Sequence, residues 1–438
     1  SRIHIVDTQS GEISPLTPKL KVPVSYHNAR FDPNLSAVYF TSDDGFDFQR
    51  LTRLDLSSGE YRYYLAQSKW DVESFELSPD GESLAVVINE GAVSKLRFLK
   101  VNSGAEILES RSPSGVITAL KWGAENKIMY GFSSALSPGQ VVYHDLDSDG
   151  KLYWMKTDLS GIKPDHLSIP VREEMRSADG SKLDAWIYRP GQIVNGRFLA
   201  SIPIRPFPVV ILFHGGPESQ FRPRFMGKYN YLISEEKIVM ICPNVRGSRG
   251  YGKKYLKADN GREREKVLFD IERIYNAIAA DPSLDQGRIA VMGGSYGGFM
   301  SLHSMVKLNN FLKCGVDVVG ISNFVTFLEN TSDYRRDLRR AEYGDERIPE
   351  MRKFLEELSP LTHVDKITRP LLIVQGANDP RVPASESEQI EKALRKRKIE
   401  TWYLLANDEG HGFRKQANRE FQFLTTVQFL RKHLLNKE

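Results

Sequence analysis

The pentapeptide Gly-x-Ser-x-Gly, residues 293–297, is the part of the sequence best suited to chemistry. It follows an apolar, β-branched run and precedes a segment with helical character. A serine at such a turn is held in a strained backbone conformation, and the flanking glycines let neighbouring chain segments come close. Ser295 is therefore predicted to be a nucleophile, with the Tyr296 N–H, at a helix N-terminus, as an oxyanion donor. The same pentapeptide also arises by chance in glycine-rich loops, so a catalytic role for Ser295 depends on whether the sequence also supplies partner residues for it.

Two residues that follow the serine along the chain have the types and the order that a proton relay needs. Asp379 comes directly after the apolar run 371–374, and His411 lies between two glycines after the run 402–405. Serine, aspartate and histidine in this order are typical of α/β hydrolases, in which the histidine serves as base and then as acid. Asp408 and Glu409 are rival carboxylates, but they lie too near His411 along the chain to approach it from the expected side. Ser295, Asp379 and His411 are thus predicted to form a catalytic triad.

A second oxyanion donor is expected where the apolar run 209–213 ends in His-Gly-Gly-Pro, residues 214–217. Such a backbone exposes N–H groups, and we assign this role to Gly216; the alternative is a plain tight turn. The glycine-rich segment 244–252 lacks the Lys-Ser/Thr ending of a phosphate-binding loop, so we interpret it as scaffold around the site.

Residues 166–438 alternate between strand and helix patterns. A hairpin over 171–188 leads into strand runs that are separated by helical periodicity, as in 265–279. This alternation predicts a mostly parallel sheet with helices on both faces, and so an α/β hydrolase domain. The strand runs span residues 209–213, 237–242, 288–292, 314–319, 371–375 and 402–405.

Residues 1–165 carry a repeat of turn-closed strands. The turn glycines Gly11, Gly59, Gly104 and Gly150 are spaced 45 to 48 residues apart. Short strands at such a period are typical of propeller blades, and about three to four blades fit, fewer than most closed propellers contain. We therefore expect an incomplete all-β propeller and a chain that is the C-terminal portion of a longer protein, or that pairs with the missing N-terminal part. The alternative is a small, irregular β-domain that is complete as it stands.

Composition narrows the class of protein. The 438 residues include 26% charged residues with a net charge of +4, spread along the chain, so neither nucleic acid nor membrane binding is indicated. The two cysteines lie in apolar runs and no metal-ligand spacing occurs, so no metal is expected. Residues 1–20 have no signal-peptide profile, which favours a cytoplasmic location, although a targeting signal could precede Ser1.

Five segments carry a family resemblance: the serine loop, His-Gly-Gly-Pro, the segment 244–252, Asn-Asp-Pro-Arg-Val-Pro over 378–383 and Asp-Glu-Gly-His-Gly-Phe over 408–413. Together they resemble the prolyl oligopeptidase family of serine peptidases, and most of all its acylaminoacyl peptidase branch. The resemblance implies the same triad and oxyanion donors, no cofactor and short peptide substrates. It also implies that Arg381 binds a substrate carbonyl, for which a surface salt bridge is the alternative, and that Val382 lines the pocket for the residue before the cleaved bond. Family members occur as monomers and as homo-oligomers, so the assembly stays open.

The predicted function is hydrolysis of short peptides or N-acylated peptides through an acyl-enzyme on Ser295. A carboxylesterase or lipase would use the same triad, and a noncatalytic propeller protein with a relic hydrolase domain is a further alternative. Near the site, Arg335, Arg336, Arg339 and Arg340 form either a basic rim or a solvated helix face, of which the solvated face is favoured.

Overall fold

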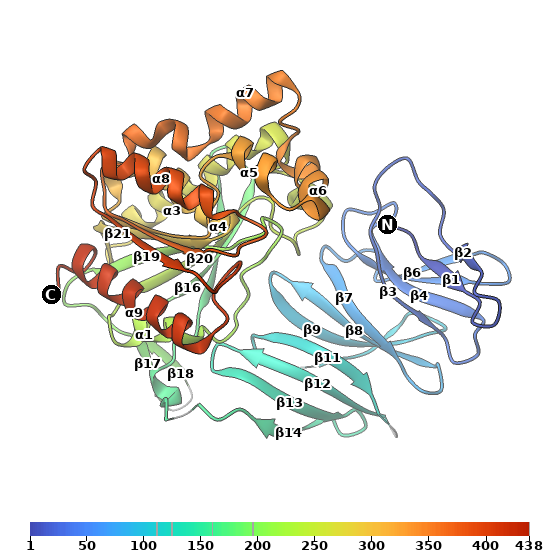
Figure 1. The fold of residues 1–438 in the computed structure, drawn as a ribbon. Coiled ribbons are helices and arrows are strands. Elements are labelled where there is room, and N and C mark those ends of the chain that lie inside the picture. Colours follow the sequence, from blue (N-terminus) through green and yellow to red (C-terminus); the bar gives the residue numbers. More distant parts are fainter. Residues whose placement is uncertain (111–112, 124–125, 160, 195–196, 438) are drawn as a thin grey trace. The chain divides into compact units, whose positions relative to one another are not determined.

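The computed structural model describes residues 1–110, 113–123, 126–159, 161–194 and 197–437 (Figure 1). The chain folds into two compact units. Unit 1 comprises residues 1–162 together with the segments 222–225 and 249–256, and unit 2 comprises the rest. Two short segments from the second half of the sequence therefore belong to the first unit.

Unit 1 is built from antiparallel sheets. Three of them have four strands each, and β1–β2 forms a further two-stranded sheet. The strands are β1 (His4–Val6), β2 (Ile13–Pro15), β3 (Tyr26–Phe31), β4 (Ala37–Ser42), β5 (Arg50–Asp55), β6 (Tyr61–Tyr64), β7 (Asp71–Leu77), β8 (Ser83–Glu90), β9 (Val93–Lys100), β10 (Glu106–Glu109), β11 (Val116–Trp122), β12 (Lys127–Ser134), β13 (Ser137–Asp145) and β14 (Gly150–Lys156).

The repeated glycine turns join the last two strands of each sheet. Gly11, Gly59 and Gly104 have φ between 71° and 76°, which glycine adopts without strain. At the fourth turn the left-handed position falls instead on Asp149, with φ of 51°, and Gly150 begins β14. Alternate residues of the middle sheet pack on its two neighbours, as Val86 and Val87 do in separate apolar clusters. The sheets therefore stack face to face through apolar layers.

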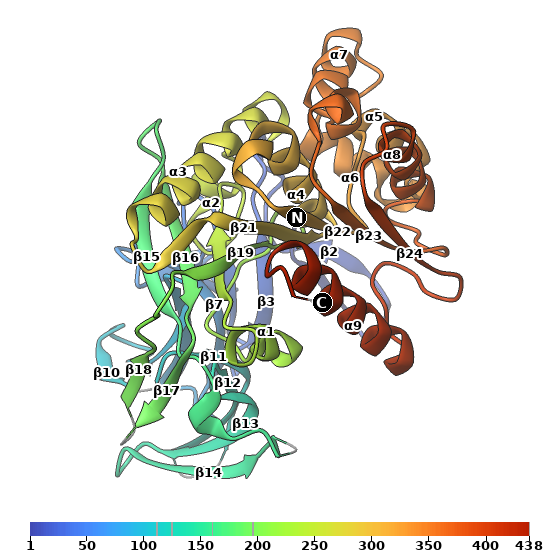
Figure 2. The same cartoon turned by 90° about the vertical axis from the view of Figure 1, so that its left-hand side faces the viewer.

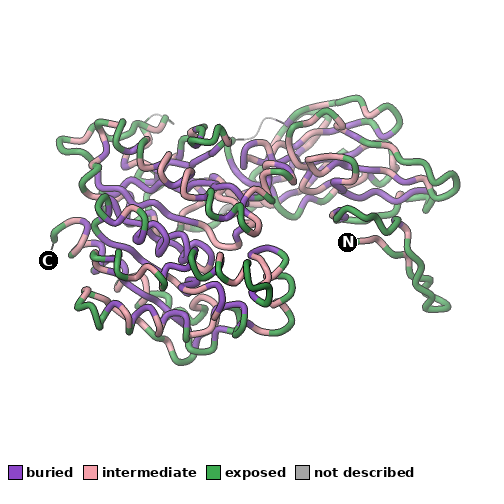
Figure 3. Tube along the Cα trace, turned by 90° about the horizontal axis from the view of Figure 1, so that it is seen from above, coloured by how far each residue is buried: buried purple, intermediate pink, exposed green. Residues whose placement is uncertain are grey.

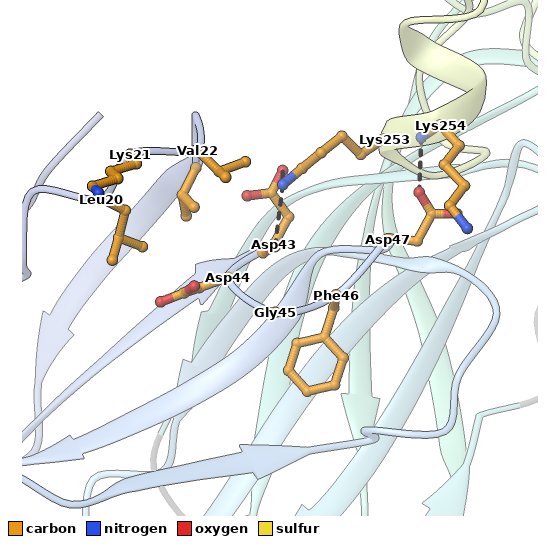
Figure 4. A pocket seen from close by; sticks show the side chains of 11 residues that line it. Leu20, Lys21, Val22, Asp43, Asp44, Gly45, Phe46, Asp47, Lys253 and Lys254 are labelled. Atoms are coloured by element: carbon orange, nitrogen blue, oxygen red, sulfur yellow. Dashed lines mark hydrogen bonds and ion pairs between the residues drawn. The ribbon is translucent and has the colours of Figure 1, made fainter.

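The segment 249–256 of unit 1 carries α2 (Lys253–Leu256) and meets the loop 43–47. Lys253 Nζ lies 3.0 Å from the Asp43 carboxylate, and the Lys254 N–H donates to Asp47 Oδ1 over 2.7 Å (Figure 4). With residues 20–22 and 24 they line an open pocket of about 620 Å³. The other inserted segment, 222–225, is held by Arg222, which donates to the Ala92 carbonyl and to the Ser94 hydroxyl.

Unit 2 contains an eight-stranded sheet in the order β15-β16-β20-β19-β21-β22-β23-β24. All neighbours from β20 to β24 pair in parallel, whereas the hairpin β15–β16 joins β20 antiparallel. A separate hairpin, β17 (Gly191–Val194) and β18 (Arg197–Ala200), precedes β19. The sheet strands are β15 (Val171–Arg176), β16 (Lys182–Tyr188), β19 (Phe207–Phe213), β20 (Val239–Asn244), β21 (Leu284–Gly294), β22 (Cys314–Val318), β23 (Leu371–Gly376) and β24 (Thr401–Ala406).

Helices cover both faces of this sheet. Figures 1 and 2 show α3, α4 and α8 on one face and α1 and α9 on the other. Buried positions gather along the strands, and exposed positions lie mainly in loops and on outer helix surfaces (Figure 3). Both faces of the central strands are buried, as the unbroken burial of β19 shows. The helices are α1 (Asn230–Ser234), α3 (Val267–Ala280), α4 (Tyr296–Lys307), α5 (Phe324–Asn330), α6 (Asp333–Tyr343), α7 (Pro349–Leu358), α8 (Ala384–Lys396) and α9 (Gln416–His433).

The predicted fold class is confirmed: an all-β region of blade-like sheets precedes a mixed, mostly parallel sheet flanked by helices.

Candidate active site

The carboxyl ends of four sheet strands carry the predicted site residues. Ser295 follows β21, the 214–217 loop follows β19, Asp379 follows β23, and His411 follows β24. Carboxyl ends of parallel strands meet at one edge, which is where open α/β sheets bind ligands. The topology therefore places all four segments at a single sheet edge.

Ser295 occupies a strained turn between β21 and α4. Its φ of 59° and ψ of −120° are unfavourable for a residue with a side chain, and its N–H donates to the Val318 carbonyl over 2.9 Å. Glycine is required around it: a Cβ on Gly293 would lie 2.2 Å from the Gly297 carbonyl oxygen, and one on Gly297 2.3 Å from the Phe213 carbonyl oxygen. The strain and the close packing together are the features expected of a nucleophile elbow.

Tyr296 and Gly216 are the predicted oxyanion donors. Tyr296 is the first residue of α4, so its N–H belongs to the unsatisfied group at the helix start. Gly216 has φ of 120°, and a Cβ there would lie 2.5 Å from the Glu218 nitrogen. The neighbouring His214 is fixed by Ser248 of the 244–252 segment, at 2.8 Å from Nε2 to Oγ. That segment thus supports the loop, as a scaffold would.

Asp379 and His411 form a hydrogen-bonded pair. His411 Nδ1 lies 2.7 Å from Asp379 Oδ2, and the aspartate side chain is fully shielded from solvent. Asp379 Oδ1 accepts the N–H groups of Arg381 and Val382 over 2.8 and 3.0 Å. The two loops are joined directly, because the Asn378 N–H donates to the Glu409 carbonyl over 2.9 Å. Nδ1 is thereby occupied, which leaves Nε2 as the ring nitrogen for proton transfer.

The two rival carboxylates are engaged elsewhere. Glu409 accepts the N–H groups of Arg414 and Lys415, and Asp408 pairs with the Lys415 ammonium at 2.5 Å.

In the described part of the chain, no hydrogen bond joins the Ser295 hydroxyl to His411. Such contacts are often long in an unliganded enzyme and shorten when substrate binds.

Val382 and Arg381 differ in exposure. The Val382 side chain is 2% exposed and packs in the hydrophobic core, so its contact with Asp379 comes from its backbone. The Arg381 side chain is exposed and has no salt bridge among the described residues.

A buried ionic cluster behind Tyr296 was not predicted from the sequence. The Arg264 guanidinium lies between the rings of Tyr296 and Tyr343, 4.9 and 4.5 Å from their centroids, and pairs with Asp259 at 2.8 Å. Asp259 also accepts the Tyr296 hydroxyl over 3.2 Å. Asp259 lies near Arg264 in the sequence, but Tyr296 and Tyr343 come from distant segments, so local patterns give no signal for the cluster as a whole.

The favoured interpretation of the α6 arginines as a solvated face is wrong. Arg339 donates to the Gly216 carbonyl over 3.2 Å and pairs with Glu342, and its side chain is only 13% exposed. Arg340 is similarly shielded and pairs with Glu346. Because these acidic partners, one of them outside the helix, neutralise the arginines, this face of α6 can be shielded from solvent.

Asp317, at the end of β22, is a further buried acid beside the elbow. Its Oδ1 lies 2.3 Å from the position that a Cβ on Gly298 would take. Burial raises the pKa of Asp317 to about 7; the Gly320 backbone opposes this shift, and the charge of Glu386 adds to it.

Neither a metal site nor a membrane span is found in what the structure describes. Within the described ranges, no three His, Cys, Asp or Glu side chains are grouped so that they could hold an ion. The helices of those ranges are also too short or too polar to cross a bilayer.

The sheet, the elbow and the His411–Asp379 pair define an α/β hydrolase with a serine nucleophile. Residues 223–437 match the prolyl oligopeptidase family, so this segment belongs to that family and the resemblance seen in the sequence is confirmed.

Among curated relatives, the chain is 32% identical to dipeptidyl aminopeptidase BIII of Pseudoxanthomonas mexicana, over 89% of this chain and 57% of that protein. It is 25% identical to the human acylamino-acid-releasing enzyme, over 69% of this chain and 42% of that protein. A puromycin-hydrolysing peptidase of Mycobacterium tuberculosis has the same fold, with a TM-score of 0.86 at 22% identity over 99% of this chain and 65% of that one. The chain thus spans little more than half the length of its first curated relatives.

Proposed function

We propose that the protein is a serine peptidase that hydrolyses short peptides or N-acylated peptides. The observation that carries the proposal is the fixed His411–Asp379 pair at the sheet edge where the strained Ser295 also lies. Family membership over residues 223–437 supports peptide substrates over other acyl compounds. In this proposal residues 166–438, except the segments 222–225 and 249–256 that fold with unit 1, form the hydrolase domain, and residues 1–165 form part of a propeller.

In the proposed reaction, Ser295 Oγ attacks the scissile carbonyl as its proton passes to His411 Nε2. The Tyr296 and Gly216 N–H groups stabilise the oxyanion, and Asp379 stabilises the imidazolium. His411 then gives the proton to the leaving amine, and a water, activated by the same ring, hydrolyses the acyl-enzyme. Arg381 binds a substrate carbonyl, and Val382 contributes the N–H that holds Asp379.

Fluorophosphonate labelling of the full chain tests the nucleophile. Covalent labelling that is lost in Ser295→Ala but kept in Ser301→Ala supports the proposal, because Ser301 lies on α4, the helix that follows Ser295, with its hydroxyl bonded to the Gly297 carbonyl. Failure of the folded chain to react would favour a noncatalytic protein.

Substrate profiling tests the reaction class. Matched amide and ester substrates separate a peptidase from a carboxylesterase, and turnover of esters alone would overturn the peptidase assignment. The relatives named above suggest two cleavage modes, release of a dipeptide and release of an acylated residue. A library that varies N-terminal blocking distinguishes these modes. A fusion of this chain to the N-terminal propeller sequence of a relative tests whether additional blades change the access of substrates to the site.

A further inference from the structure

Helix α6 connects the two loops that flank the proposed catalytic centre. At its start, the Ser332 hydroxyl donates to the Pro380 carbonyl and the Thr331 hydroxyl to the Arg381 carbonyl, each over 2.7 Å. Further along, Arg339 donates to the Gly216 carbonyl over 3.2 Å. One face of α6 therefore runs from the loop with the proposed triad carboxylate to the loop with the proposed oxyanion donor.

Arg335 lies on that face, because it precedes Arg339 by four residues. Its side chain is partly buried, and its Nη1 atom is buried without a hydrogen-bond partner within the described ranges. The neighbouring arginines of the helix differ: Arg336 pairs with Asp333, and Arg339 with Glu342. No carboxylate lies within ion-pair distance of Arg335 in the part of the chain that the structure describes.

The charges around Arg335 are unfavourable to it. Burial, followed in size by the positive charge of Arg339, lowers the pKa of the Arg335 guanidinium, and Arg381 also lowers it. A partly buried cation beside two like charges is stabilised by any ligand that supplies negative oxygens. Guanidinium groups bind carboxylates in preference to neutral acceptors, with two parallel hydrogen bonds.

We propose that Arg335, together with Arg381, binds a carboxylate of the substrate, so that the enzyme prefers peptides with a carboxylate near the scissile bond. The carboxylate belongs either to an Asp or Glu side chain or to a free peptide C-terminus. The inference rests on the proposed peptidase function and adds the substrate class. It goes beyond the carbonyl contact assigned to Arg381, since a neutral carbonyl would leave the excess positive charge uncompensated.

The test uses the full chain and peptides that differ in one group. One series exchanges Glu for Gln at each position near the cleaved bond, and a second exchanges the free C-terminal acid for the amide. We expect a kcat/KM ratio of about ten or more in favour of one acidic form, because charge-assisted hydrogen bonds are stronger than neutral ones. Preference within the first series identifies a side chain as the source, and preference within the second identifies the chain end.

The Arg335→Gln variant should reduce this ratio to near one, whereas Arg335→Lys should keep part of it. Arg347→Gln is the charge-matched control, since Arg347 is exposed and pairs with Asp345, and it should keep the full ratio. Wild-type enzyme without any preference, or a preference that survives in Arg335→Gln, would overturn the inference.

Calorimetric binding of the same peptides to the Ser295→Ala variant separates this inference from the proposed function. If the wild type is not labelled by fluorophosphonate, the proposed function fails, and the binding ratio in calorimetry still decides the role of Arg335. If labelling occurs but the binding ratio is one, only the carboxylate site fails.

Discussion

Replacing Asp379 by asparagine should abolish most activity while leaving the loop in place. Two N–H groups, from Arg381 and Val382, point at Oδ1, so the asparagine must turn its carbonyl oxygen toward them. Its NH2 group then faces His411 Nδ1, which lies 2.7 Å from Oδ2 in the wild type. That ring nitrogen becomes an acceptor, the ring proton moves to Nε2, and the neutral histidine can no longer take the proton of Ser295.

The expected loss in kcat is about 10⁴-fold, or roughly 5.5 kcal/mol in the barrier, as for a triad histidine held in the wrong tautomer. The free energy of unfolding should fall by no more than about 2 kcal/mol, because both backbone hydrogen bonds to Oδ1 are kept. Turnover of a chromogenic amide and urea unfolding measure the two quantities.

Asp408→Asn is the matched control, because it removes an exposed carboxylate from the His411 loop. It should leave turnover within about twofold of wild type. If Asp379→Asn kept turnover within about tenfold of wild type, or if Asp408→Asn caused the larger loss, the assignment of Asp379 would be refuted.

Three further predictions concern the surroundings of the site. Gly293→Ala should abolish fluorophosphonate labelling, since its Cβ would lie 2.2 Å from the Gly297 carbonyl oxygen; labelling at the wild-type rate would contradict the packing described for the elbow. Arg264→Met should lower the unfolding free energy by about 3–5 kcal/mol, because it leaves Asp259 as an uncompensated buried charge. The double variant with Asp259→Leu should recover much of this loss in urea titrations. Equal losses in both variants would argue against the ion pair. For Asp317, the folded-state pKa of about 7 lies above the ordinary value of 3.8, so its contribution to stability falls as pH rises from about 4 to 7. The unfolding free energy of Asp317→Asn, relative to wild type, should therefore grow by up to roughly 4 kcal/mol between about pH 4 and pH 8, and a pH-independent difference would show that Asp317 ionises normally.

Local chemistry made the central part of the site predictable. The Ser295 turn needs glycines at fixed spacing and a strand on one side, and both are visible in a short window of sequence. The repeated turns of residues 1–165 are likewise local, because the left-handed glycines at 11, 59 and 104 recur with similar flanking residues. Such features depend on backbone sterics over a few residues, so the fold class followed from them.

The features of the structure that the sequence did not predict depend on tertiary packing. The segments 222–225 and 249–256 lie in the sequence of the hydrolase half, yet they fold with unit 1. Their anchors, Arg222 and Lys253, pair with residues of the N-terminal half, and a charged side chain carries no mark of its distant partner. The Arg264 cluster was not predicted because its two rings, Tyr296 and Tyr343, come from distant parts of the chain.

The α6 arginines show that the presence or absence of an acidic partner distinguishes a charge with a structural role from a charge with a proposed functional role. All four occur at helical spacing within six residues and look alike in sequence. In the fold, Glu342 and Glu346 neutralise Arg339 and Arg340, which therefore hold the helix and the 214–217 loop in position. Among the residues that the structure describes, no acid pairs with Arg335, although burial increases the free energy that such a pair would gain there. Within the described residues this positive charge lacks an acidic partner close to the loop of the proposed triad carboxylate, so the substrate is the group that compensates it most readily.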